Sequence, residues 1–128
     1  MARNEVFKAA DYLSLPVKVG TKSGDAVRIG GLNAVATTDE PTAWHAEHGA
    51  WDQHPSGNKD GYASVSLKGA YRLPVAGTVV LAVGDPVYIT PAGVVTSTDN
   101  TGANALFGHA LTPKTATAGT PVVVRIHN

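Results

Sequence analysis

Three of the five histidines lie in one polar segment, residues 41–61, and they are the residues best suited to chemistry. The segment also holds both tryptophans, and its candidate ligands and their neighbours are Trp44, His45, Glu47, His48, Trp51, Asp52 and His54. Imidazole and carboxylate groups bind zinc when three or four are held by rigid elements. His45 and His48 are three residues apart, which suits one face of a helical turn, but no His-Glu-x-x-His signature is present. We therefore expect no metal and no cofactor, and we interpret residues 41–61 as a surface loop or insertion.

Aromatic side chains in such a segment can pack on their own domain or on a neighbouring subunit. Tryptophan is enriched among the residues that anchor interfaces between proteins. The sequence therefore indicates a possible interface made by Trp44, His45, Trp51 and His54.

Other catalytic and binding signatures are absent from the sequence. There is no Gly-x-Ser-x-Gly elbow for a nucleophile and no Gly-x-x-x-x-Gly-Lys-Ser/Thr loop for phosphate. The chain has no cysteine, which excludes disulfides, thiolate metal centres and cysteine catalysis. Ten basic residues balance ten acidic ones, which argues against a nucleic-acid partner. We expect that the protein is not an enzyme.

The charged residues are distributed unevenly along the chain. Residues 1–72 carry 16 of the 20 charged side chains, and residues 73–128 carry only Asp85, Asp99, Lys114 and Arg125. A long segment with so few charges is either mostly buried or exposes an uncharged surface, and little then keeps copies apart in solution. We expect residues 73–128 to supply much of the core and part of a subunit interface.

The elements that must position these residues are short strands. Valine and threonine are frequent, glycine and proline separate the apolar stretches, and no amphipathic helix of ten residues or more is visible. This pattern predicts an all-β fold, a small β-barrel or sandwich, in a single domain over residues 16–128. Residues 1–15 have no clear period and are interpreted as an extended N-terminal arm. No signal-peptide core or membrane span is visible, so we expect synthesis in a cytoplasm and no membrane partner.

An internal repeat supports the β interpretation. Residues 24–39 (GDAVRIGGLNAVATTD) and 84–99 (GDPVYITPAGVVTSTD) align without a gap at an offset of 60, with seven identities in 16 positions. Each copy predicts a turn followed by a β-hairpin, with Gly24, Asp25, Gly84 and Asp85 as structural turn residues. A metal or acid–base site built from Asp25, Asp39, Asp85 and Asp99 is the alternative, but each carboxylate stands where a turn requires one.

Five short motifs follow one another along the chain: KSGDAVRIGGL (22–32), ASVSLKGAYRLPV (63–75), VGDPVYIT (83–90), LFGHAL (106–111) and VVVRI (122–126). In this order they resemble a family of tailed-phage capsid decoration, or cement, proteins, and the resemblance covers most of residues 16–128. It implies a β-tulip-like domain, a homotrimer on the outside of an icosahedral head, and an N-terminal arm that reaches the major capsid protein. The segment 41–61 is longer and more aromatic than the family pattern.

The expected function is therefore non-enzymatic stabilisation of a phage head, with the protein located in the virion. The residues expected to form the capsid-binding arm are Arg3, Asn4, Val6, Phe7, Lys8 and Tyr12. Strand addition by such an arm obtains affinity from main-chain hydrogen bonds. The alternative functions are a β-barrel binding module, for carbohydrate or as a tail accessory, with Trp44 and Trp51 as a stacking platform, and a metal-dependent enzyme at the histidines.

Overall fold

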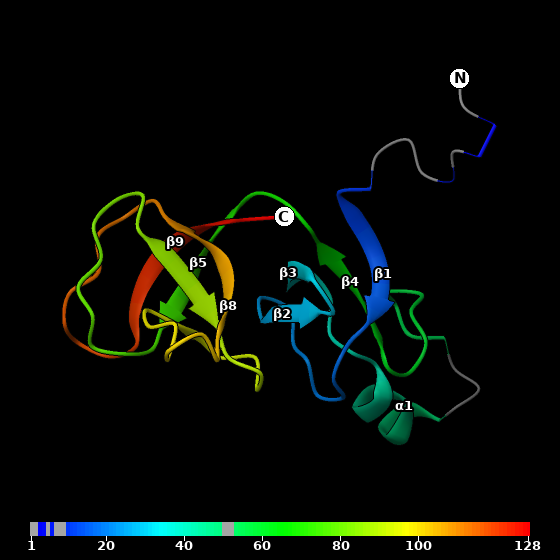
Figure 1. Ribbon diagram of the computed structural model, residues 1–128. Coiled ribbons are helices and arrows are strands. Elements are labelled where there is room, and N and C mark those ends of the chain that lie inside the picture. Colours follow the sequence, from blue (N-terminus) through cyan, green and yellow to red (C-terminus); the bar gives the residue numbers. More distant parts are fainter. Residues whose placement is uncertain (1–2, 5, 7–9, 50–52) are drawn as a thin grey trace.

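The computed structural model describes residues 3–4, 6, 10–49 and 53–128 of the chain. Within these ranges it contains nine strands and one short helix (Figure 1). The strands are β1 (Tyr12–Pro16), β2 (Ala26–Ile29), β3 (Leu32–Ala36), β4 (Tyr62–Ser66), β5 (Ala70–Val75), β6 (Pro86–Ile89), β7 (Val95–Thr96), β8 (Ala105–Ala110) and β9 (Thr120–Ile126). The helix, α1 (Thr42–His48), lies within the segment interpreted as a loop or insertion. The predicted all-β class is confirmed.

The strands form two antiparallel sheets that follow one another along the chain. The first sheet has the order β1-β4-β3-β2, and the second has the order β5-β9-β8-β6-β7. Both sheets curl, the second on the left of Figure 1 and the first on the right. An isolated bridge joins Ala76, directly after β5, to Thr96 of β7. The edges of the second sheet therefore meet and close it into a small barrel, whereas the first sheet stays open.

The two sheets have the same connectivity once β7 is set aside. In each, the first strand pairs with the fourth, the fourth with the third and the third with the second. Single hydrogen bonds also correspond: the Gly24 N–H donates to the Ala36 carbonyl and the Gly84 N–H to the Ala110 carbonyl, both at 2.7 Å. We call residues 11–67 and 69–126 the first and second halves. The chain thus repeats one four-stranded unit, and β8 is the counterpart of β3.

The turns before β2 and β6 are built alike, as the repeat predicts. Gly24 and Gly84 both have φ of 93°, a left-handed conformation in which a side chain would be strained. The Asp25 carboxylate accepts the Lys22 N–H at 2.9 Å, and the Asp85 carboxylate accepts the Ala82 N–H at 2.8 Å. The two following hairpins, β2–β3 and β6–β7, are also present.

The main core fills the barrel of the second half. Its buried members include Leu73, Val75, Val87, Ile89, Phe107, Val122 and Val124, and Val35 of β3 packs against them. A smaller cluster, centred on Ala34, Ala36 and Val65, lies in the first half. Each large apolar side chain buried in this way contributes about 1.5–3 kcal/mol to stability. Because β3 supplies residues to both clusters, the halves share one continuous packing arrangement.

Polar contacts also join the two halves, at Asn33 of β3. Its buried side-chain amide donates to the carbonyls of Leu106 and His127, at 2.9 and 2.7 Å. The Asn128 amide in turn donates to the carbonyl of Asn33 at 2.8 Å. The strand β1 begins at Tyr12, so the boundary expected between the arm and the domain at residue 15 falls inside this strand.

Candidate functional site

The aromatic cluster of α1 is a packed assembly of rings. Trp44 stacks on His48 with ring centroids 4.1 Å apart and an interplanar angle of 7°. His54 meets Trp44 edge-on at 5.0 Å, and His45 does so at 5.3 Å. One face of the Trp44 ring is therefore covered by an imidazole of its own chain.

Each imidazole of this cluster also has a local polar partner. The Nδ1 atom of His45 contacts the Asp60 carboxylate, that of His48 the Trp44 carbonyl at 3.0 Å, and that of His54 the Ser56 hydroxyl at 2.7 Å. In the described part of the chain, no group of three or more His, Cys, Asp or Glu side chains is arranged to hold a metal ion. Trp51 and Asp52 lie outside the described residues. The ring contacts and hydrogen bonds of Trp44 and the three histidines therefore stabilise the described part of segment 41–61.

The N-terminal arm leaves the domain at the start of β1, at the upper right of Figure 1. Among its predicted anchors, Val6 is 82% exposed and Tyr12 is 65% exposed. Arg3 and Asn4 form part of a turn and are exposed, whereas Phe7 and Lys8 lie outside the described residues. Val6 and Tyr12 thus offer apolar surface that the domain does not cover.

The arm is tied to the domain at Asp11. The Leu67 N–H donates to the Asp11 carbonyl at 2.7 Å, and the Lys68 ammonium lies 2.9 Å from the Asp11 carboxylate. The Lys68 ammonium donates a hydrogen bond to this carboxylate, and this bond, together with the negative charge of Asp11, raises the pKa of the Lys68 amine. These contacts hold Asp11 against the residues that follow β4.

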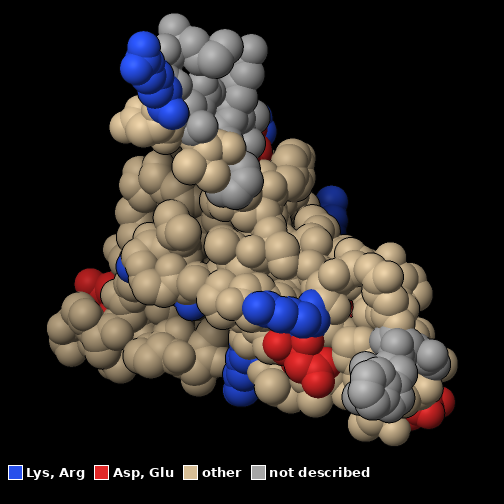
Figure 2. Space-filling view, turned by 90° about the vertical axis from the view of Figure 1, so that its right-hand side faces the viewer, with Lys and Arg blue, Asp and Glu red and all other residues tan. Residues whose placement is uncertain are grey.

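Several exposed apolar side chains lie in the segment between β5 and β6. Val79, Val80 and Val83 precede β6 and are 48%, 64% and 65% exposed. Leu111 is also exposed, and the residue before it, Ala110, accepts the N–H of Gly84, which follows Val83. We call Val79, Val80, Val83 and Leu111 the valine patch. On the face of the molecule that bears β1 and α1, most of the surface is uncharged, and basic and acidic side chains lie against one another near the centre of the view (Figure 2).

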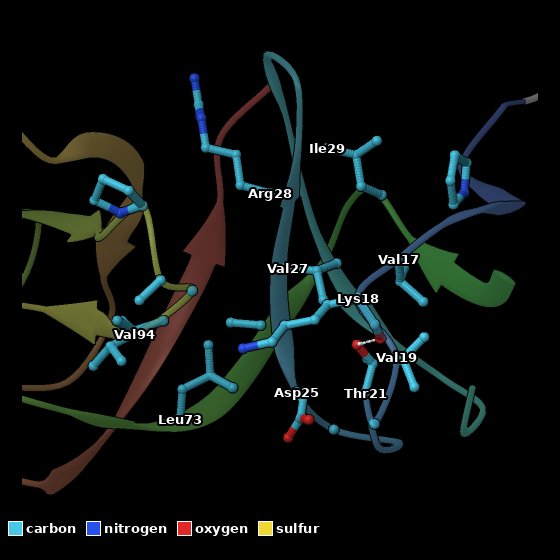
Figure 3. A pocket seen from close by; sticks show the side chains of 18 of the residues that line it. Val17, Lys18, Val19, Thr21, Asp25, Val27, Arg28, Ile29, Leu73 and Val94 are labelled. Atoms are coloured by element: carbon cyan, nitrogen blue, oxygen red, sulfur yellow. Dashed lines mark hydrogen bonds between the residues drawn. The ribbon is translucent and has the colours of Figure 1, made fainter. Parts of the chain in front are cut away.

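A groove of about 770 Å³ lies beside β2. Its lining comes from the segment 16–21 that follows β1, from residues 24–29, from Leu73 and Pro74, and from the loop 91–95. The side chains of Val17, Val27 and Ile29 gather on one side of β2, toward the segment that follows β1 (Figure 3). The sequence interpretation missed this groove.

A signal for the groove is nevertheless present in the sequence. The tripeptide Leu-Pro-Val occurs at residues 15–17 and again at 73–75. Pro16 and Val17 of the first copy, at the end of β1, line the groove. Leu73 and Pro74 of the second copy, at the end of β5, line it too, while Leu73 and Val75 are also buried in the barrel core. The repeated tripeptide therefore marks two strand ends that border the groove.

Comparison with known proteins agrees with this architecture. A family model described as phage cement protein matches residues 8–126, which covers both halves and the groove. No curated protein and no solved structure matches the chain. Within the described residues, no helix is long and apolar enough to cross a membrane. The chain belongs to the phage cement protein family.

Proposed function

We propose that this protein binds the outside of an icosahedral phage head and stabilises it, in a structural and not an enzymatic role. The observation that carries the proposal is the family match over residues 8–126. Membership in a cement protein family implies association with the phage capsid. The partners are the major capsid protein and further copies of this chain, with no nucleic acid and no membrane. The protein is made in the host cytoplasm and functions in the virion.

The arm is the segment that contacts the major capsid protein. Its anchors are Arg3, Asn4, Val6, Phe7, Lys8 and Tyr12. The high exposure of Val6 and Tyr12 supports this role. Contact with a partner would remove the apolar surface of both side chains from water, which is favourable. An extended arm that adds a strand to the shell obtains affinity from main-chain hydrogen bonds and specificity from alternate side chains.

The valine patch is the face through which copies associate into a homotrimer. Its side chains are apolar and exposed, and the chain around them carries few charges that would repel another copy. The cluster of Trp44, His45, Trp51 and His54 is a second possible contact with a neighbouring subunit or the shell. Many linked contacts on one head raise the effective concentration of each next contact.

Removal of residues 2–10 tests the arm. This deletion retains Asp11, its ion pair with Lys68 and the whole of β1. The truncated protein is expected to keep its circular dichroism spectrum and unfolding midpoint, but to lose binding to heads that lack the protein, measured by cosedimentation. The substitution Val6→Asp is expected to weaken binding in the same direction, since it places a charge in a contact that must lose water.

Full occupancy of heads by the truncated protein would overturn the assignment of the arm. Failure of the intact protein to bind the heads would instead overturn the proposed function.

A further inference from the structure

The strand β7 fills a defined slot in the second half. It pairs with β6 on one side, with Tyr88 opposite Thr96 and Ile89 opposite Val95. On its other side it bonds the residue after β5: the Ala76 N–H donates to the Val95 carbonyl, and the Ser97 N–H donates to the Ala76 carbonyl, both at 2.9 Å. Without β7, the strands β5 and β6 would be the two edges of this sheet, and β7 closes the gap between them.

The first half has the same gap, and none of its described residues forms a strand there. Its corresponding edge strands are β1 and β2, and the chain passes from β2 to β3 through Gly30 and Gly31 alone. In the second half, residues 90–104 connect β6 to β8, and they contain β7. Because β2 is an edge strand, every second residue directs its N–H and C=O away from β3, toward the groove.

Apolar side chains at corresponding positions of the two halves differ in burial, as expected if a strand is present in one half and absent from the other. Leu73, Val75, Val87 and Ile89 are buried in the core of the second half, with exposed fractions of 4%, 0%, 0% and 1%. Their counterparts Leu15, Val17, Val27 and Ile29 are only half-buried. The same apolar residue types therefore stand around a filled slot in one half and around an open groove in the other.

We propose that the groove between β1 and β2 receives an extended strand of the phage shell protein, which pairs with β2 as β7 pairs with β6. The inference rests on the proposed function and adds a second contact to that of the arm. In this arrangement an apolar side chain of the incoming strand contacts Val17, Val27 and Ile29, in the place that Val95 takes in the second half. The groove, of about 770 Å³, extends past β2 to Leu73, Pro74 and residues 91–95 of the second half, and it has room for several residues of such a strand.

Charge favours the shell protein over another copy of this chain as the occupant. Lys18 and Arg28 line the groove against one acidic residue, Asp25, whose carboxylate accepts the Lys22 N–H, so the charged lining has a net positive charge. The Lys18 side chain extends across β2 (Figure 3). Neither Lys18 nor Arg28 has an acidic partner among the ion pairs of the described residues. The arm of a second copy carries Arg3 and Lys8 against one Glu5, so its charge matches that of the groove and does not complement it. The arm of the same molecule leaves at the opposite end of β1. The occupant is therefore an alternating apolar strand with an acidic residue.

Charge reversal at the groove tests the inference. The variants Lys18→Glu and Arg28→Glu change exposed side chains, and the control Arg125→Glu changes an exposed cation on β9, outside the groove. Binding to heads that lack the protein is measured together with the unfolding midpoint. Each groove variant is expected to weaken binding about tenfold or more, because reversed charges at an interface repel. Lys18→Glu is expected to keep the unfolding midpoint and carries the test, whereas Arg28→Glu is expected to lower it, because Arg28 donates to the side-chain oxygen of Asn33 at 2.6 Å. The control is expected to bind like the wild type.

Site-directed cross-linking identifies the occupant. The chain has no cysteine, so Lys18→Cys and Arg125→Cys each provide a single attachment point for a photoreactive maleimide. On decorated heads, the probe at residue 18 is expected to label an extended, acidic peptide of the shell protein. The probe at residue 125 is expected not to label this peptide.

The outcomes separate this inference from the function on which it rests. If the wild type binds heads and the groove variants bind equally well, the inference is wrong while the proposed function stands. Labelling of a second copy of this chain from residue 18 also overturns it. If the wild type itself does not bind heads, the proposed function fails.

Discussion

At the scale of residues, two buried charged residues, Glu40 and Lys114, occupy corresponding positions in the two halves. The Glu40 N–H bonds the Thr21 carbonyl, and the Lys114 N–H bonds the Leu81 carbonyl, both at 2.9 Å. The Glu40 carboxylate accepts both the N–H and the hydroxyl of Thr42. Glu40 lies in the segment after β3, and Lys114 lies in the segment after β8. The polar groups of both side chains have hydrogen-bond partners in nearby loops, and these bonds hold the loops in place.

The Lys114 ammonium organises the loops at one end of the barrel. It donates to the carbonyls of Gly77, Thr115 and Thr117 at 2.8, 2.8 and 3.2 Å. The substitution Lys114→Met removes all three bonds and leaves buried acceptors without donors. We expect a loss of about 2–4 kcal/mol in the free energy of unfolding, measured with denaturant.

The matched control is Lys22→Met, at an exposed lysine whose ion pair with Asp39 spans 4.0 Å. It is expected to change the free energy of unfolding by less than about 0.5 kcal/mol. Equal effects of the two substitutions would contradict the structural role given to Lys114.

At the scale of elements, the hairpins could be predicted from sequence but their place in the sheets could not. The Gly-Asp turns and the Val-x-Ile alternation specify β2 and β6 locally. The offset of 60 also aligns Val35 of β3 with Val95 of β7, although hydrogen bonds make β8 the counterpart of β3. Closure of the barrel decides that pairing, and it depends on strands far apart in the sequence.

The helix and the groove escaped prediction for physical reasons of the same kind. The helix α1 has seven residues and no side-chain cap at its start, so no local signal is strong. The groove exists because a strand is missing between β1 and β2, and a missing strand leaves no residues to recognise. The aromatic and histidine residues of segment 41–61 were identified, but their mutual stacking became visible only from the fold.

The close approach of β8 and β9 gives a prediction for one glycine. A Cβ atom at Gly108 would lie 2.1 Å from the Arg125 carbonyl oxygen, which is backbone and cannot move aside easily. The substitution Gly108→Ala is expected to destabilise the protein by about 3 kcal/mol or more, measured by thermal and denaturant unfolding. Gly31→Ala is the control, since nothing lies within 4 Å of a Cβ there, and it is expected to be tolerated. Tolerance of alanine at residue 108 would show that β8 and β9 pair differently.

At the scale of the whole molecule, the two halves differ both in charge and in their share of the core. Two of the three ion pairs of the described residues lie in the first half, the third joins Asp11 to Lys68 between the halves, and the barrel core lies in the second half. Asn33 and Val35 of β3 connect them, one by hydrogen bonds and one by packing. The second half thus supplies the rigid body, and the first half presents the arm, the aromatic cluster and the open groove.

The valine patch gives a prediction about assembly. The double substitution Val80→Lys and Val83→Lys places charges on exposed positions, so the fold is expected to keep its unfolding midpoint. Its mass by sedimentation equilibrium is expected to fall from that of a trimer to that of a monomer, because like charges then face one another. A trimer that survives this change would place the subunit interface elsewhere.

The central claim is that this protein binds the outer surface of a phage head and stabilises it. A reconstruction by electron cryomicroscopy of heads with and without added protein, combined with release of packaged DNA on heating, tests it most directly. The account predicts trimeric density on the outside of the shell, strands of the shell protein beside β2 and the arm, and DNA release at higher temperature when the protein is present. Heads that bind no protein, or that release DNA at the same temperature with it bound, would contradict the account.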